Sequence, residues 1–220
     1  MSNPLLQSII KEVNKQKLSY EQLRYLFREV RKACAINPEV KEESLFDLPT
    51  HEELQNFYKY TPPKLKLIFK TLEGTGLRIS ELLNLEIKDI DFQNNTIFVR
   101  KGKGGKDRYT VFGNTLKEKL MLYLLGRKNR YLFESNRHTR YTPRCIQIFC
   151  QRFKDQATID KKFTVHTLRH VWNTRLAEAN ILAEHRAILA GHSNLSSQEI
   201  YTHVGVAGIK PKLIEILDKY

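Results

Sequence analysis

His166 and Arg169 form the first pair of residues whose types and spacing can carry out chemistry. An imidazole and a guanidinium three positions apart share one face of a helix. The imidazole can transfer a proton near neutral pH, and the guanidinium can hold a phosphate through two parallel hydrogen bonds. Alone the pair is a weak signal, because a surface ion pair or a capping contact is the commoner arrangement.

A second group lies near the C-terminus, where Gly191 and His192 precede Tyr201. Gly191 suits the end of a helix, and Ser196 with Glu199 forms a capping box that would start a short helix carrying Tyr201. A tyrosine hydroxyl can act as a nucleophile. A single tyrosine is more often a half-buried core residue, so this group also needs support from elsewhere.

A third motif joins Gly74 and Gly76 to Arg78, which stands at the start of a predicted helix. The backbone N–H groups and the positive end of the helix dipole at such a junction favour an anion. The alternative is an ordinary loop-to-helix junction in which Arg78 pairs with Glu81.

A fourth motif is a β-hairpin, with strands predicted at residues 96–99 and 108–112 and a glycine-rich turn between them. Basic side chains surround the turn, namely Arg100, Lys101, Lys103, Lys106 and Arg108. A slender cationic tip can enter a nucleic-acid groove, so Lys101, Lys106 and Arg108 are candidate DNA contacts. A solvated, positively charged turn is the alternative.

Taken together and in their order along the chain, the motifs resemble the tyrosine recombinase family. This family includes lambda-type phage integrases, transposon integrases and Xer-type resolvases. The matching phrases are TGLRISELLNL, GKGGKDR, HTLRH, LAGHS and IYTHV. They extend from Thr75 to Val204, about three-fifths of the chain, and agreement at all five is far more specific than one motif.

The resemblance implies a metal-independent enzyme that cleaves and rejoins DNA through a 3′-phosphotyrosine. Six residues match the family's catalytic positions: Arg78, Lys103, His166, Arg169, His192 and Tyr201. Arg78, Arg169 and His192 would hold the phosphate, and Tyr201 would attack it. His166 would accept the tyrosine proton, and Lys103, or Lys106 in its place, would protonate the departing 5′ oxygen. Neither ATP nor a small-molecule cofactor is needed.

The charge distribution indicates a polyanionic partner. The chain of 220 residues has a net charge of +13 and a pI of about 9.6. Residues 1–47 carry a net +1, which leaves +12 on the remainder. With the resemblance, this points to a site-specific recombinase or integrase on double-stranded DNA, with other protomers in a DNA-bound tetramer. A type IB topoisomerase-like enzyme and a truncated DNA-binding accessory protein are the alternatives.

The expected fold is mainly α with a small antiparallel β-sheet. We expect a short helical arm and linker over residues 1–47 and a catalytic domain over residues 48–220. The family usually carries a longer N-terminal domain, so this arm is either a reduced version of that domain or what is left after part of it was lost or trimmed. We expect the arm to pack on the main domain, a second protomer or DNA. Trp172 should lie in the core, and the predicted helix at residues 210–219 should dock on a neighbouring protomer or on its own domain.

The remaining features concern location. Three cysteines without a C-x-x-C pair favour a reducing cytoplasm. The N-terminus does not resemble a signal peptide, and no apolar run approaches the ~18 residues of a membrane span. The sequence therefore predicts a cytoplasmic protein of bacterial, phage or mobile-element origin, associated with the nucleoid in use and without a membrane partner.

Overall fold

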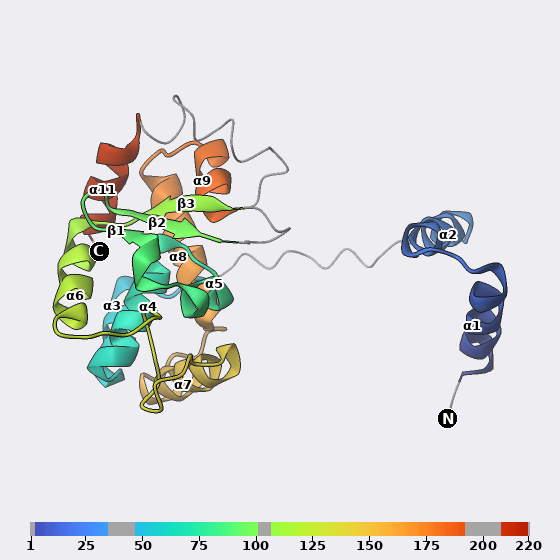
Figure 1. The fold of residues 1–220 in the computed structure, drawn as a ribbon, viewed down its shortest axis with the longest axis horizontal. Coiled ribbons are helices and arrows are strands. Elements are labelled where there is room, and N and C mark those ends of the chain that lie inside the picture. Colours follow the sequence, from blue (N-terminus) through green and yellow to red (C-terminus); the bar gives the residue numbers. More distant parts are fainter. Residues whose placement is uncertain (1–2, 35–46, 101–106, 192–207, 220) are drawn as a thin grey trace. The chain divides into compact units, whose positions relative to one another are not determined.

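The computed structural model describes residues 3–34, 47–100, 107–191 and 208–219. The chain divides into two compact units, residues 1–46 and residues 47–220 (Figure 1). The first unit contains α1 (Pro4–Gln16) and α2 (Tyr20–Ala33). A capping box starts α2, because the Ser19 hydroxyl accepts from the Gln22 N–H and the Gln22 side chain accepts from the Ser19 N–H.

Neither helix of the first unit buries a residue. Many of their large apolar side chains are exposed, among them Leu5, Leu6, Ile10, Leu26, Phe27 and Val30. Two amphipathic helices that bury so little cannot form a stable core by themselves, which is why the sequence predicts a partner for this arm.

The second unit is mainly helical. Its helices are α3 (His51–Tyr60), α4 (Pro63–Thr75), α5 (Ile79–Asn84), α6 (Asn114–Leu124), α7 (Pro143–Gln156), α8 (Val165–Glu178), α9 (Ala183–Ala190) and α11 (Lys210–Asp218). A short 3-10 turn covers Ile87–Asp89. A Thr50–Glu53 capping box starts α3, and the Thr142 hydroxyl caps α7 by accepting from the Cys145 N–H.

The sheet has three antiparallel strands in the order β1–β2–β3, namely β1 (Ile90–Asp91), β2 (Thr96–Val99) and β3 (Arg108–Val111). The predicted hairpin is confirmed, with Val99 opposite Arg108, and β1 is a two-residue addition that the sequence pattern did not reveal. In the view of Figure 1, α9 and α11 lie on one side of the sheet and α3, α4 and α7 on the other.

Two buried clusters hold this unit together. The larger includes Phe57, Phe69 and Leu82, and the smaller surrounds Trp172, which is 1% exposed, as expected of a core residue. Helix α11 belongs to the smaller cluster through Leu213. The mainly helical architecture with a small antiparallel sheet is therefore the one predicted.

The C-terminal helix α11 packs on its own unit, against α6, α8 and β3. Its Asp218 caps the start of α6, because one carboxylate oxygen accepts from the Thr115 N–H at 2.8 Å and the other from the Asn114 amide at 3.0 Å. Of the two arrangements left open by the sequence, the structure has the intramolecular one. In the described part of the chain, no helix combines the length and the apolar character that a membrane crossing requires.

Candidate functional site

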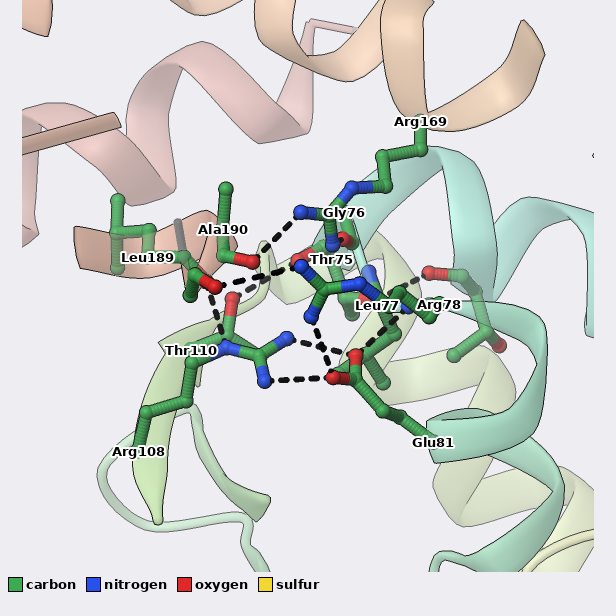
Figure 2. Close-up of polar contacts among 12 residues, drawn as sticks. Thr75, Gly76, Leu77, Arg78, Glu81, Arg108, Thr110, Arg169, Leu189 and Ala190 are labelled. Carbon is green, nitrogen blue, oxygen red and sulfur yellow. Dashed lines mark hydrogen bonds and ion pairs between the residues drawn. The ribbon is translucent and has the colours of Figure 1, made fainter. Parts of the chain in front are cut away.

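The carboxylate of Glu81, on the first turn of α5, lies between two guanidinium groups (Figure 2). Arg78, which caps α5, donates from its backbone N–H to Oε2 and from Nη1 to Oε1, both at 2.8 Å. Arg108, the first residue of β3, donates from Nη1 to Oε1 at 2.8 Å and from Nη2 to Oε2 at 2.7 Å. Glu81 therefore ties the glycine-rich junction to the hairpin.

The position of Arg108 corrects the prediction that it contacts DNA from the hairpin tip. Its side chain is 5% exposed, and its Nε also donates to the carbonyl of Leu189 at 3.0 Å. Side chains alternate along a strand, so Arg108 points inward like buried Thr110, whereas Tyr109 between them is exposed. A buried guanidinium paired with a carboxylate is part of the framework and not a mobile groove contact.

Arg169, on α8, reaches the same place from the opposite direction. Its Nη1 donates to the carbonyl of Gly76, and its Nη2 donates to the carbonyl of Ala190 at 2.6 Å. Arg78 donates from Nη2 to the carbonyl of Gly191 at 3.3 Å. The carbonyls at the C-terminal end of α9 therefore accept hydrogen bonds from several arginines. These contacts are favourable because that end of a helix has unsatisfied acceptors and carries partial negative charge.

Two glycines allow these approaches. Gly76 ends α4 with a φ of 64°, and a Cβ there would lie 2.5 Å from the Trp172 ring. Gly191 ends α9 with a φ of 69°, and a Cβ there would lie 3.0 Å from Arg108. Positive φ is a conformation that glycine adopts without a steric penalty. The helix end that the sequence predicts at Gly191 is present, and the positive φ at both glycines lets the arginines and Trp172 approach the backbone closely.

The cluster formed by Arg78, Glu81, Arg108 and Arg169 has an excess of positive charge. Its three guanidinium groups and one carboxylate give a formal charge of +2 in a largely buried place. Burial alone would raise the pKa of Glu81, but the hydrogen bonds and charge of Arg108, together with hydrogen bonds from Arg78, lower that pKa to about 2.

The pKa of Arg169 responds to the same excess. Burial and the positive charges of Arg78 and Arg108 lower it, Glu81 opposes them, and together they bring the pKa of Arg169 to about 10. Positive charges that destabilise the protonated form of one guanidinium will stabilise an anion bound among them. The cluster is therefore suited to hold a phosphodiester.

His166 lies on α8, one turn before Arg169, and its side chain is exposed. The start of α8 is fixed by Thr164 and Thr167, because the Thr164 N–H donates to the Thr167 hydroxyl at 2.9 Å. His166 lines an open hollow of about 800 Å³ together with side chains of α7, including Arg144 and Gln151. The spacing predicted that His166 and Arg169 would share a helix, and they do.

The other predicted site residues lie outside the described residues, namely Lys101, Lys103, Lys106, His192 and Tyr201. The described chain reaches the cluster at one end of each of these two segments, at Arg108 and at Gly191. Residues 101–106 connect β2 to the strand that begins with Arg108, and residues 192–207 follow Gly191, whose carbonyl accepts from Arg78.

Sequence reasoning missed Glu81 as the organising carboxylate. The motif offered Glu81 only as a partner for Arg78, and the second guanidinium comes from a strand that starts far along the chain. Strand alternation was the one available signal, because it places Arg108 on the same face as Thr110. Within the described ranges, no group of His, Cys, Asp and Glu side chains is arranged to hold a metal ion.

Comparisons with known proteins agree with this geometry. Residues 49–207 match the family described as the phage integrase family. Tyrosine recombinase XerA of Thermococcus onnurineus is 37% identical over 195 residues, which cover 82% of this chain and 68% of that protein. Tyrosine recombinase XerC of Oceanobacillus iheyensis is 38% identical over 149 residues, which cover 62% of this chain and 48% of that protein.

Solved structures show the same fold. A crystal structure of XerA recombinase aligns with a TM-score of 0.62 and 26% identity, covering 97% of this chain and 83% of that one. A Tn1549 transposon integrase in complex with transposon right end DNA aligns with a TM-score of 0.61 at 19% identity, which supports the fold alone. The predictions of family, fold class and class of enzyme are thus confirmed, and the chain belongs to the phage integrase family as a tyrosine recombinase.

Proposed function

We propose that this chain cleaves and rejoins double-stranded DNA at specific sites, with the Tyr201 hydroxyl as nucleophile and a 3′-phosphotyrosine as intermediate. The observation that supports it most directly is the convergence of Arg78 and Arg169 on the C-terminal end of α9. This cluster carries a formal charge of +2 and contains donors suited to phosphate oxygens.

The chemistry explains why two guanidinium groups are needed. A phosphodiester is an anion that repels a nucleophile, and in-line attack places more charge on its non-bridging oxygens. Donors that are already fixed around those oxygens lower the barrier without reorganisation. Arg78 is fixed by Glu81, and Arg169 by two carbonyls, so both are held before DNA arrives.

The remaining roles follow from the family positions. Tyr201 attacks the phosphorus, His166 accepts its proton as general base, and Lys103 protonates the departing 5′ oxygen, with Lys106 as the second candidate. His192 adds a phosphate contact. The P–O bond to the 5′ oxygen is replaced by a P–O bond to the tyrosine, so a 5′ hydroxyl can later reverse the step without ATP. A tyrosine is a weak nucleophile at neutral pH, with an ordinary pKa near ~10, so it requires such a base.

The organisation of the whole protein is part of the proposal. Residues 48–220 form the catalytic domain, and residues 1–47 form a helical arm that helps to hold DNA. Double-stranded DNA is the partner, and strand exchange between two sites requires further protomers, four in a DNA-bound tetramer. The enzyme acts where cellular DNA lies, in the cytoplasm at the nucleoid. The curated relatives do not favour the two alternatives, a topoisomerase-like enzyme and an idle accessory protein.

The test uses suicide substrates that carry a nick beside the scissile phosphate, so that religation is blocked and a covalent protein–DNA adduct accumulates. We expect an adduct that survives denaturation with the wild type and none with Tyr201→Phe. Tyr60→Phe is the matched control, because Tyr60 is exposed at the end of α3 and the variant should form the adduct normally. An adduct formed by Tyr201→Phe, or DNA binding by the wild type without any adduct, would refute the assignment.

A second assay distinguishes a recombinase from a nicking–closing enzyme. Two differently labelled duplexes carrying the same site are incubated with the wild type. Exchange of labelled arms between the duplexes is expected. Relaxation of supercoiled DNA without any exchange would instead support the topoisomerase-like alternative.

A further inference from the structure

Helix α8 is tied to the C-terminal end of α4 at three successive levels. Arg169 donates to the carbonyl of Gly76, and the ring of Trp172, three residues further along α8, lies against the same glycine. Another three residues along, Arg175 donates from Nη1 to Glu73 Oε1 at 2.6 Å. Glu73 precedes Gly76 by three residues, so the first and third contacts reach the same end of α4.

The same helix is tied to α9 at two levels. Arg169 donates from Nη2 to the carbonyl of Ala190 at 2.6 Å. Asn173 lies one turn further along α8 and accepts from Arg186 Nη1 at 3.1 Å. Arg186 lies one turn before Ala190 on α9, so the two contacts are in antiparallel register. The two helices whose carbonyls hold Arg169 are therefore each linked to α8 by a second polar contact.

Glu73 combines burial with several polar partners. Its side chain is 3% exposed, and it accepts from the Tyr58 hydroxyl of α3 at 2.5 Å, while Lys70 Nζ lies 3.0 Å from Oε2. Burial alone would raise the pKa of Glu73, but the positive charges of Lys70 and Arg175, together with hydrogen bonds from Tyr58 and Lys70, lower that pKa. The carboxylate is therefore ionised at neutral pH and holds α8 against α3 and α4 through charge-assisted hydrogen bonds.

The distance between these links determines how firmly Arg169 is placed. Arg175 lies about 9 Å along the helix axis from Arg169, at a rise of about 1.5 Å per residue. Two attachments to α4 that far apart fix the tilt of α8 as well as its distance from α4. Precise placement matters for catalysis, because a displacement of about 1 Å in a group that contacts the reacting atoms can cost about a hundredfold in rate.

We propose that Glu73 and Asn173 are positioning residues for the cleavage of DNA, which act through Arg169 and do not themselves touch the DNA. This inference rests on the proposed function, in which Arg169 holds the scissile phosphate. Glu73 keeps the acceptor at the end of α4 within reach of Arg169, and Asn173 does the same for the acceptor at the end of α9. Loss of either link displaces the guanidinium and slows the attack on the phosphate.

The experiment measures single-turnover cleavage of a nicked suicide substrate by the full chain at saturating DNA, as release of the strand that ends in the 5′ hydroxyl. Two substrates are compared. One has an ordinary phosphodiester at the scissile position, and the other has a methylphosphonate, in which a methyl group replaces one non-bridging oxygen. The methylphosphonate is neutral and therefore depends less on a guanidinium. A displaced Arg169 should slow cleavage of the two substrates unequally.

Both variants should affect the phosphodiester more than the methylphosphonate. Glu73→Gln should slow cleavage of the phosphodiester about tenfold or more and cleavage of the methylphosphonate by less than about threefold. Asn173→Ala should show the same pattern with a smaller loss, and it preserves α8 because alanine is the strongest helix former. The dissociation constant for uncleaved DNA should change by less than about threefold, because many phosphate contacts share the binding.

Glu134→Gln is the matched control. Glu134 is also buried, at 7% exposed, but its Oε1 accepts from the backbone N–H groups of Arg130 and Tyr131 in the loop between α6 and α7. This variant should lose stability as Glu73→Gln does and yet cleave both substrates at the wild-type rate. All variants are assayed at a temperature at which circular dichroism shows each of them to be folded.

Crystal structures of the two variants report the placement of Arg169 without DNA. We expect its guanidinium to leave the carbonyl of Gly76 in Glu73→Gln and that of Ala190 in Asn173→Ala. An unmoved Arg169 in both, or equal losses on both substrates in Glu73→Gln, would overturn the proposal, since the links would then contribute to stability alone. Failure of the wild type to cleave either substrate would instead refute the proposed function, and the crystal structures would still decide the placement of Arg169.

Discussion

Replacing Glu81 with glutamine tests the role of the carboxylate that organises the arginine cluster. Glu81 is 7% exposed and accepts four hydrogen bonds, two from Arg78 and two from Arg108. Glutamine has nearly the same shape but is neutral and replaces one acceptor oxygen with a donor. The variant leaves Arg108 buried without a counter-charge, and buried charges that lose their partner are strongly destabilising.

The magnitude follows from the pKa of Glu81, which falls from 4.5 to about 2 on folding. Each pKa unit corresponds to about 1.4 kcal/mol, so ionised Glu81 contributes about 3 kcal/mol to the free energy of unfolding at pH 7. Because the folded-state pKa is the lower one, this contribution is fully present above about pH 4.5. It is lost as the pH falls through about 2.

The assay is urea denaturation of the wild type and Glu81→Gln at several pH values. We expect a difference of about 3–5 kcal/mol at pH 7, since breaking a buried ion pair typically costs this much. The difference should be about 2 kcal/mol smaller at pH 3, because part of the stabilisation from the ionised carboxylate is already lost there. Glu118→Gln is the matched control on an exposed surface and should change stability by less than about 0.5 kcal/mol.

Two results would refute this reasoning. A difference below about 1 kcal/mol at pH 7 would mean that the pairing with Arg78 and Arg108 contributes little. A large difference that is the same at pH 7 and pH 3 would mean that the shape of the side chain matters and its charge does not.

Two further predictions concern the glycine junction and the hairpin. Gly76→Ala should destabilise the protein by at least about 3 kcal/mol, because the added methyl group strains the positive φ and collides with Trp172. The control Gly126→Ala has the same backbone strain but lies in open space, so it should cost about 1 kcal/mol. Thermal unfolding measures both losses of stability, and equal losses would contradict the contact with Trp172. Lys106→Gln should reduce the magnitude of the slope of log DNA affinity against log salt concentration by about one. Arg108→Gln should leave that slope unchanged and lower the stability of the protein, because Arg108 is buried. A smaller slope for Arg108→Gln would instead show that Arg108 contacts DNA.

Local hydrogen bonding explains what could be predicted from the sequence. The helix starts at Ser19 and Thr50 are determined by capping boxes only four residues long, and both are present in the structure. The helix ends at Gly76 and Gly191 depend on the conformational freedom of a single glycine. The hairpin follows from strand alternation around a glycine-rich turn. Each of these signals is complete within a few residues.

Tertiary contacts explain what could not be predicted. Strand β1 contains two residues, too few for an alternating pattern, and exists because Ile90 pairs with Ile97. In the sequence, Arg108 is one more basic residue of the turn, and only the structure shows that it pairs with Glu81. The acceptors for Arg169 are the carbonyls of Gly76 and Ala190, and no residue type indicates where a backbone carbonyl will lie.

The contacts of Arg78 and Arg169 also affect how the site binds a phosphate. A guanidinium on a free side chain would have to be ordered when the phosphate arrives, at the expense of rotamer entropy. Here Arg78 is held by a carboxylate three residues away, and Arg169 by two carbonyls from different helices. The ordering is therefore complete when the chain folds, and phosphate binding need not supply it. Stability and phosphate binding consequently depend on the same groups, so a variant that loosens Glu81 should weaken both, even though Glu81 carries the same sign of charge as DNA.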